Sequence, residues 1–169
     1  MRVAHDAHAL FLRFDCDDRD IWATHARRDA PLWDEEVVEV FVAPGEDDPT
    51  EYAEIEVNPL GAVFDARVVN PLGLRESMRV DASWNAAGLV ATVERPSPGA
   101  WRAELVIPWG DLDPRALQRV WRANFFRIER PRDGDPEFSC WSPTFADPPD
   151  FHKPRSFGRL VLDGVGTSA

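Results

Sequence analysis

Apolar and polar residues alternate one by one along several short segments of the chain, and this period of two most restricts the folds it can adopt. The segment 9–17 reads ALFLRFDCD, with leucine, phenylalanine and cysteine side chains on one side and arginine and aspartate side chains on the other. Successive side chains of an extended strand point to opposite faces. We therefore expect a half-buried β-strand here.

Two further segments show the same period. In Tyr52–Asn58 (YAEIEVN) the alanine, isoleucine and valine side chains point inward, and the tyrosine, the two glutamates and the asparagine point outward. In Glu36–Val42 (EVVEVFV) the second, fourth and sixth positions share one face, which is apolar except at one position. That position is Glu39, which projects from an otherwise apolar strand face.

Turn signals separate these segments from further strands. The tetrapeptide NPLG occurs at 58–61 and again at 70–73, and Pro in the second place with Gly in the fourth suits a type I turn. Further strands are expected at 62–69, 76–84, 89–94, 101–107, 121–129, 137–141 and 157–162, with a short helix near 109–117. About ten short strands predict an all-β antiparallel sandwich of the jelly-roll or immunoglobulin-like kind.

The chain has 169 residues, a length that suits one domain with a self-sufficient core. We expect a single domain over residues 1–162 and a flexible C-terminal tail over 163–169. The stretch 143–154 holds four prolines, which stiffen a long loop and limit the entropy that it loses on binding.

The charge balance restricts the partners. Lysine and arginine number 19 against 30 aspartates and glutamates, a net charge of -11 that repels phosphate backbones and anionic lipid surfaces. We therefore expect neither nucleic acid nor a membrane as partner. No stretch approaches the roughly 20 apolar residues of a membrane-spanning helix, and the N-terminus lacks a basic region followed by an apolar run.

The two cysteines, Cys16 and Cys140, lie far apart and form neither a metal-site spacing nor a disulfide framework, so we expect two buried thiols. The aromatic composition is unusual, with seven Trp and ten Phe against one Tyr. Large aromatic side chains build cores or present stacking surfaces. Some of the tryptophans are therefore expected to be functional.

Three fragments place aromatic residues beside polar strand ends: APLWDEEVVEVFVAP, EYAEIEVNPLG and PPDFHKPRSFGRLVL. Together they resemble the family 9 carbohydrate-binding modules. The resemblance runs from the LFLRFDCDD strand through W-x5-E-x-F, the asparagine-ended strand, the IPW and WSP segments and finally FHKPRSFGRL. It begins inside the family pattern, since the strand that usually comes first is not found before residue 9, and the localisation is left open.

The resemblance implies an all-β domain that binds an oligosaccharide or polysaccharide without cleaving it. It favours binding at the end of a glycan chain over binding at an internal unit. It places Trp33 as the first of two rings that sandwich a sugar, and Phe151 where the second ring is usually Trp. It places Glu39 and Asn58 among the polar sugar contacts. At the position of Glu56 the family can have a basic side chain that contacts the sugar. The acid at this position therefore affects which sugar is bound.

The acidic run Asp15, Asp17, Asp18 and Asp20 raises the question of a metal. It lacks the loop glycine and the terminal glutamate of an EF-hand, so a solvated acidic turn is favoured. The resemblance leaves room for a structural calcium ion, and otherwise no cofactor is expected.

Three other functions stay open. A glycosidase needs two carboxylates flanking one bond, and no sequence feature selects a pair. Related heme-binding sandwiches use an axial Met with a His or Lys, for which Met78 with His152 or Lys153 are the candidates. A third alternative is a protein-interaction sandwich that has lost sugar binding. The sequence does not indicate an oligomeric state.

Overall fold

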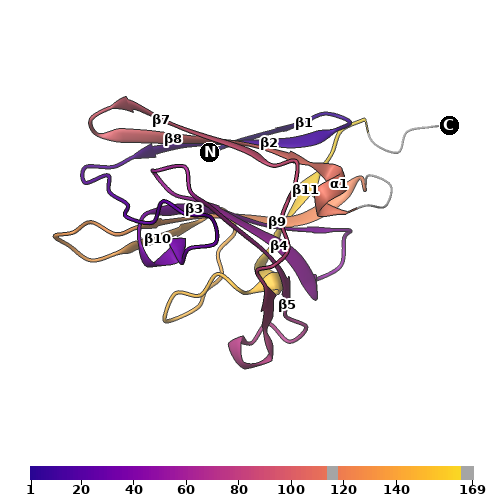
Figure 1. Cartoon of the computed structure of the whole chain (residues 1–169). Coiled ribbons are helices and arrows are strands. Elements are labelled where there is room, and N and C mark those ends of the chain that lie inside the picture. The colour runs from indigo at the N-terminus through magenta and orange to yellow at the C-terminus, as the bar shows by residue number, and fades with distance from the viewer. Residues whose placement is uncertain (114–117, 165–169) are drawn as a thin grey trace.

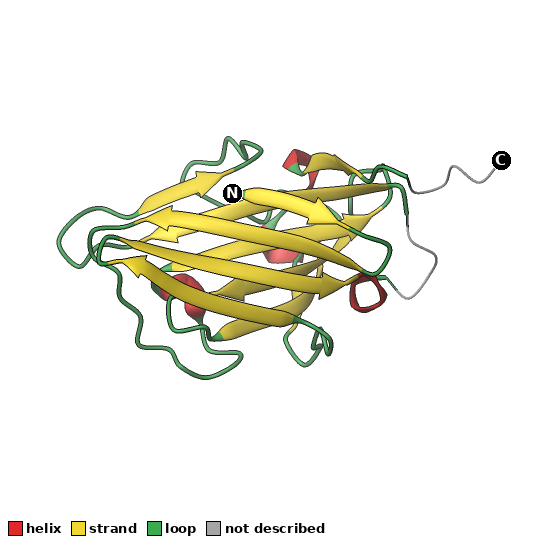
Figure 2. Cartoon of the chain, turned by 90° about the horizontal axis from the view of Figure 1, so that it is seen from above, coloured by secondary structure: helices red, strands yellow, loops and turns green. Residues whose placement is uncertain are grey.

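The computed structural model describes residues 1–113 and 118–164 and confirms the all-β antiparallel sandwich. One sheet has the strand order β1-β2-β8-β7, and the other has β10-β9-β3-β4-β5-β6, with β11 also paired to β9. Figure 1 shows the two sheets as stacked layers, and Figure 2 shows the smaller sheet from above. The strands are β1 Arg2–His5, β2 Ala9–Asp17, β3 Val37–Pro44, β4 Glu51–Val57, β5 Val63–Val69, β6 Arg79–Asp81, β7 Val90–Ser97, β8 Ala100–Pro108, β9 Val120–Glu129, β10 Glu137–Cys140 and β11 Gly158–Val161.

Short helical turns join some of the strands: η1 Leu32–Asp34, η2 Arg75–Ser77, α1 Trp109–Leu112 and η3 Pro154–Ser156. The expected helix near 109–117 is thus present in its first part, and residues 114–117 lie outside the described residues. The last five residues of the expected tail, 165–169, also lie outside them. None of the helices that the structure describes has the length and apolar character needed to span a membrane.

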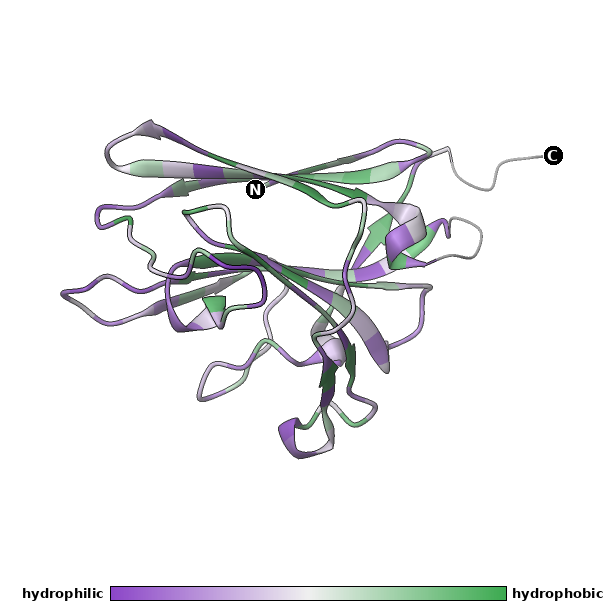
Figure 3. Ribbon diagram, viewed as in Figure 1, coloured by the Kyte–Doolittle hydropathy of each residue, from purple (hydrophilic) through white to green (hydrophobic). Residues whose placement is uncertain are grey.

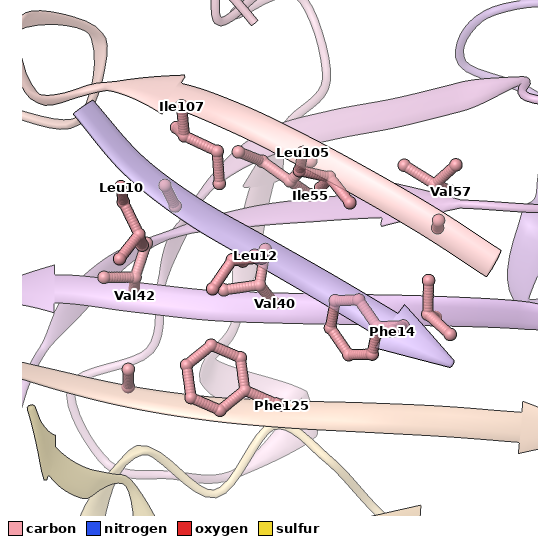
Figure 4. Close-up of a cluster of buried hydrophobic side chains, with 14 of the residues drawn as sticks. Leu10, Leu12, Phe14, Val40, Val42, Ile55, Val57, Leu105, Ile107 and Phe125 are labelled. Carbon is pink, nitrogen blue, oxygen red and sulfur yellow. The ribbon is translucent and has the colours of Figure 1, made fainter. Parts of the chain in front are cut away.

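The main core fills the space between the two sheets. Alternate side chains of the central strands point into it, and Figure 4 shows them meeting across the gap. The labelled side chains are Leu10, Leu12, Phe14, Val40, Val42, Ile55, Val57, Leu105, Ile107 and Phe125. The period of two read in the sequence is therefore the pattern that builds this core.

A second apolar cluster lies on the opposite face of the larger sheet. It includes Phe41, Phe64 and Phe126 from the strands and Leu32, Phe151 and Phe157 from connecting segments. The C-terminal connecting segments, gold to yellow in Figure 1, pass beneath this face. Hydrophobic stretches follow the strands of both layers, and the loops carry most of the hydrophilic stretches (Figure 3). The larger sheet is therefore covered on both faces.

Several boundaries differ from the expectation. The strand expected over 76–84 is limited to β6, because η2 occupies its first residues. β1 was not predicted, and it pairs with β2 from Arg2–Arg13 to His5–Leu10. Both NPLG turns are confirmed, since the glycine N–H donates to the asparagine carbonyl three residues earlier. The expectation of two buried thiols is wrong for Cys140, which is exposed on the edge strand β10, whereas Cys16 is buried.

Candidate functional site

A pocket of about 340 Å³ opens on the loop-covered face of the larger sheet. Its volume falls within the range of about 300–1,000 Å³ that small-ligand sites occupy. Strands β3, β4, β5 and β9 supply its floor, and η1, η2, β6, β10 and the segment before η3 supply its walls. The lining residues are Trp33, Glu39, Glu54, Glu56, Phe64, Arg75, Met78, Val80, Ile128, Arg130, Phe138, Pro149, Phe151 and His152.

Trp33 forms one wall of the pocket, and contacts with neighbouring residues hold it in place. Its neighbour Leu32 is fully buried in the second apolar cluster, which fixes η1 against the sheet. The indole meets Phe64 edge to face, with ring centroids 5.1 Å apart. The Arg130 guanidinium donates a hydrogen bond to the Trp33 carbonyl oxygen. The ring nevertheless stays 42% exposed, so it offers surface to a ligand.

Phe151 lies on the wall of the same pocket and is packed more tightly. Its ring stacks on Phe126, with centroids 4.1 Å apart and planes 14° apart, and Phe138 meets it edge to face. Only 8% of Phe151 is exposed. The structure thus brings Trp33 and Phe151, which are distant in sequence, to one pocket, with Glu39 on its floor.

Three glutamates meet on the pocket floor. Antiparallel pairing of β3 with β4 sets Glu39 opposite Glu56 and Phe41 opposite Glu54, so the carboxylates share one face. One oxygen from each of the three lies within 4.8 Å of the others. All three are buried, although Glu54 and Glu56 were expected to point outward. That expectation is corrected because connecting segments cover this face of the sheet.

Burial governs the electrostatics of these groups. Loss of solvent, and then repulsion from neighbouring carboxylates, raises the pKa of Glu39 and of Glu56 well above the ordinary range. Burial raises the pKa of Glu54 to about 7. A pocket floor with three acids of this kind favours ligands that donate hydrogen bonds or carry positive charge.

His152 closes one side of the floor. Its Nδ1 atom shares a 2.7 Å hydrogen bond with the Tyr52 hydroxyl, and its Nε2 lies 3.7 Å from a Glu54 oxygen. Burial lowers the pKa of His152 to about 3, so the ring is neutral near pH 7. Met78, its partner in the heme alternative, lines the same pocket, whereas Lys153 pairs with Asp150.

Asn58 is not among the residues that line the pocket. Its side-chain amide donates to the His25 carbonyl oxygen at 2.7 Å, and its side-chain oxygen accepts from the backbone N–H groups of Leu60 and Ala62. The side chain is fully buried by these contacts. In this structure Asn58 braces the first NPLG turn rather than facing a ligand.

Sequence reasoning did not identify Glu54, Phe64, Arg75 or Phe138 as pocket residues. A signal for Glu54 was present, because it shares a strand face with Glu56. Whether Phe64, Arg75 and Phe138 line the pocket depends on which segments cover this face of the larger sheet. The alternation of apolar and polar residues does not show this.

Three of the four aspartates in the acidic run at the end of β2 and just beyond it pair with arginines. Asp15 pairs with Arg13 and Arg102, Asp18 with Arg127, and Asp20 with Arg132. These contacts occupy carboxylate oxygens that a calcium ion would need. The one group of three His, Cys, Asp or Glu ligands found within metal-binding distance in the described residues is the glutamate cluster on the pocket floor.

Comparison with known proteins agrees with this architecture. The model of carbohydrate-binding family 9 matches residues 1–162. A relative named extracellular protein, from Arthroderma benhamiae, is 26% identical over 171 aligned residues that cover 96% of this chain and 77% of the relative.

Two solved structures are similar in fold. A proposed carbohydrate-binding protein from Bacteroides uniformis superposes with a TM-score of 0.76 at 21% identity, over 95% of this chain and 76% of that one. A family 9 module from Caldicellulosiruptor kristjanssonii, in complex with cellotriose, gives a TM-score of 0.68 at 14% identity, over 99% of this chain and 75% of that one.

Proposed function

The chain belongs to carbohydrate-binding family 9, and we propose that it binds one sugar unit of an oligosaccharide or polysaccharide, without cleaving it, in the pocket between Trp33 and Phe151. The observation that carries this proposal is that these two rings and Glu39 line one pocket. The neighbour that holds cellotriose supports a glucan as the first ligand to test.

The chemistry of the pocket suits a pyranose. The C–H faces of a sugar ring are apolar and weakly positive, and the faces of aromatic rings are negative, so stacking on Trp33 is favourable. By analogy with bases, an aromatic platform contributes about 1–3 kcal/mol. The carboxylates beneath accept hydrogen bonds from hydroxyl groups, at about 0.5–1.5 kcal/mol for each neutral bond. Affinities in the micromolar range follow, since about −8 kcal/mol corresponds to a Kd of about 1 μM.

Asn58 is left out of the proposed sugar contacts because its carboxamide is already fully engaged by the turn. Phe151 contributes little stacking surface, because Phe126 covers one of its faces and only 8% of the residue is exposed. Trp33 is therefore the main stacking surface of the proposed site.

Calorimetric titration tests the proposal. The purified chain is titrated with glucose, cellobiose, cellotriose and xylobiose, and with the reduced alditols of the disaccharides. We expect saturable binding of at least one oligosaccharide, and loss of affinity on reduction identifies a reader of reducing ends. A flat titration with every sugar, together with a blank glycan array, overturns the proposal. Release of new reducing ends during incubation overturns its non-catalytic part.

A further inference from the structure

The three glutamates on the pocket floor lack the cationic partners that buried carboxylates normally have, although the side chains of Glu54 and Glu56 bond to each other. Among the described residues, no Lys or Arg nitrogen lies within 4.0 Å of an oxygen of Glu39, Glu54 or Glu56. The closest basic group is the neutral His152 ring beside Glu54. Glu56 is 1% exposed, and its Oε2 atom has no hydrogen-bond partner in the described part of the chain. Buried carboxylates are costly without such partners.

The two arginines on the pocket wall are engaged elsewhere. Arg75 donates to Asp150 at 2.9 Å, and that carboxylate is shared with Lys153. Arg130 lies over the Phe138 ring and donates to the Trp33 carbonyl oxygen. Arg75 is near enough to lower the pKa of Glu39 somewhat, yet burial raises it more. The pocket floor therefore presents three carboxyl groups without a cation of their own, and burial keeps them largely protonated until a cation binds.

We propose that this pocket prefers a sugar unit with a free amino group, whose ammonium is held by Glu39, Glu54 and Glu56. The preference rests on the proposed sugar function and names the ligand class within it. An ammonium carries three N–H donors, which matches three acceptor carboxylates. Oxygens placed around a tetrahedral nitrogen at about 2.8 Å lie about 4.6 Å apart. The three glutamates offer oxygens within 4.8 Å of one another.

The lining of the pocket favours an ammonium over a metal ion. Calcium takes 6–8 oxygen ligands, and the three glutamates, the only lining side chains with oxygen among the described residues, reach the lower limit of six only if all three bind through both oxygens. The remaining wall is largely aromatic and aliphatic, and an aromatic face attracts an organic cation as well as a sugar ring. A neutral sugar can bond to the carboxyl groups through hydroxyl groups, but unlike an ammonium it gains no ion pair with them.

Three trisaccharides with the same β-1,4 backbone test the preference: chitotriose with free amines, its N-acetylated form, and cellotriose. Titrations are run at about pH 7, where primary amines are largely protonated and a bound ammonium favours ionised carboxyl groups, after dialysis against EDTA. We expect chitotriose to bind at least tenfold more tightly than cellotriose, and the N-acetylated trimer to gain nothing. Cellotriose binding at equal or higher affinity overturns the amine preference and leaves sugar binding intact. Failure of all three trimers overturns the amine preference, and the wider titrations and the glycan array then decide sugar binding separately.

Charge-removing variants locate the effect. Glu56→Gln keeps the shape of the side chain and removes its ionisable group, so we expect the affinity for chitotriose to fall more than the affinity for cellotriose, which brings the ratio of the two toward one. The matched control is Asp47→Asn, which removes one exposed charge beyond the end of β3 and outside the pocket. It should leave the preference unchanged, although the chain has a net charge of -11. Circular dichroism confirms that each variant is folded.

Two outcomes contradict the assignment to the glutamate cluster. If Asp47→Asn weakens the preference as much as Glu56→Gln does, general attraction to an acidic surface explains the result. If chitotriose binds only when calcium is added back after EDTA, a metal ion occupies the carboxylates instead of the ammonium.

Discussion

The indole of Trp141 lies so close over Gly158 that a Cβ atom at position 158 would come within 2.6 Å of Cη2 of the ring. The same indole packs against Phe125 of β9, with centroids 5.5 Å apart. Trp141 and Gly158 stand at the two ends of the segment that carries Phe151. Their contact therefore fixes both ends of one wall of the pocket on the larger sheet.

Gly158→Ala is expected to destabilise the protein, because the added methyl group forces the Trp141 ring to move. Overpacking of this kind costs about 1–3 kcal/mol. Urea unfolding measures the change. Gly110→Ala is the control, since a Cβ atom at that position meets nothing within 4 Å. Equal stability of both variants would contradict the contact.

Trp33→Ala and Phe151→Ala are expected to differ. Removing the half-exposed Trp33 ring should reduce sugar affinity about 5- to 150-fold, which corresponds to about 1–3 kcal/mol, with little change in stability. Phe151→Ala should also lower the free energy of unfolding by about 3–5 kcal/mol, because the ring is stacked in an apolar cluster. Calorimetry and urea unfolding separate the two effects. Unchanged affinity in Trp33→Ala argues that the sugar does not stack there.

Asn58→Ala is expected to affect stability and not binding. The substitution leaves the His25 carbonyl and the N–H groups of Leu60 and Ala62 without their side-chain partner. Unsatisfied buried groups cost about 1–3 kcal/mol each at most. The variant is compared with the parent chain by urea unfolding and by titration with the sugar that binds best. A tenfold loss of affinity for the sugar at unchanged stability would show that Asn58 contacts the sugar.

Glu36 makes the stability of the folded protein fall as the pH rises, which is opposite in sign to ordinary acid denaturation. Burial raises the pKa of Glu36 to about 8. Between the ordinary pKa of a glutamate and this raised pKa, the folded state holds a proton that the unfolded state has released. The contribution of this proton to the free energy of unfolding is therefore fully present below the ordinary pKa and is lost as the pH rises toward the raised pKa. One such group changes the free energy of unfolding by at most about 1.4 kcal/mol per pH unit.

Glu36→Gln should therefore reduce the loss of stability between about pH 5 and pH 8. The amide keeps an oxygen that can accept the hydrogen bond from the Arg130 N–H. Urea unfolding of parent and variant across this range measures the difference. Parallel curves would show that Glu36 does not hold the proton.

The two thiols should differ in reactivity. Burial raises the pKa of Cys16 to about 12, whereas Cys140 is exposed on β10. Iodoacetamide at about pH 8 should alkylate Cys140 alone in the folded protein and both cysteines in urea. Mass spectrometry of peptides reads out the sites, and Cys140→Ser should abolish labelling of the folded chain. Labelling of Cys16 at a comparable rate would contradict its burial.

Most of the sandwich was predictable because its central strands alternate over seven residues or more. β1 was missed because four residues, RVAH, are too short to display a period. Alternation also placed Glu39 on the correct face of its strand. It could not show that Glu54 and Glu56 are buried, because it separates two faces without stating what covers each of them.

The site residues came from the resemblance rather than from periodicity, and they were predictable to different degrees. Trp33, Glu39 and Phe151 line one pocket. Asn58 shares a strand face with the glutamates, but the chain turns directly after it, and the turn takes up its side chain. Distinguishing a turn-bracing asparagine from a ligand contact requires the coordinates of the turn.

The acids of the pocket are fixed by the pairing of β3 with β4, whereas Trp33 and Phe151 are carried by segments between strands. A library that randomises the connecting segments would therefore reshape the walls around a constant anchor. Because the strands carry the acids and the connecting segments carry the rings, the scaffold is a starting point for engineered binders whose selectivity is changed without redesigning the sheet.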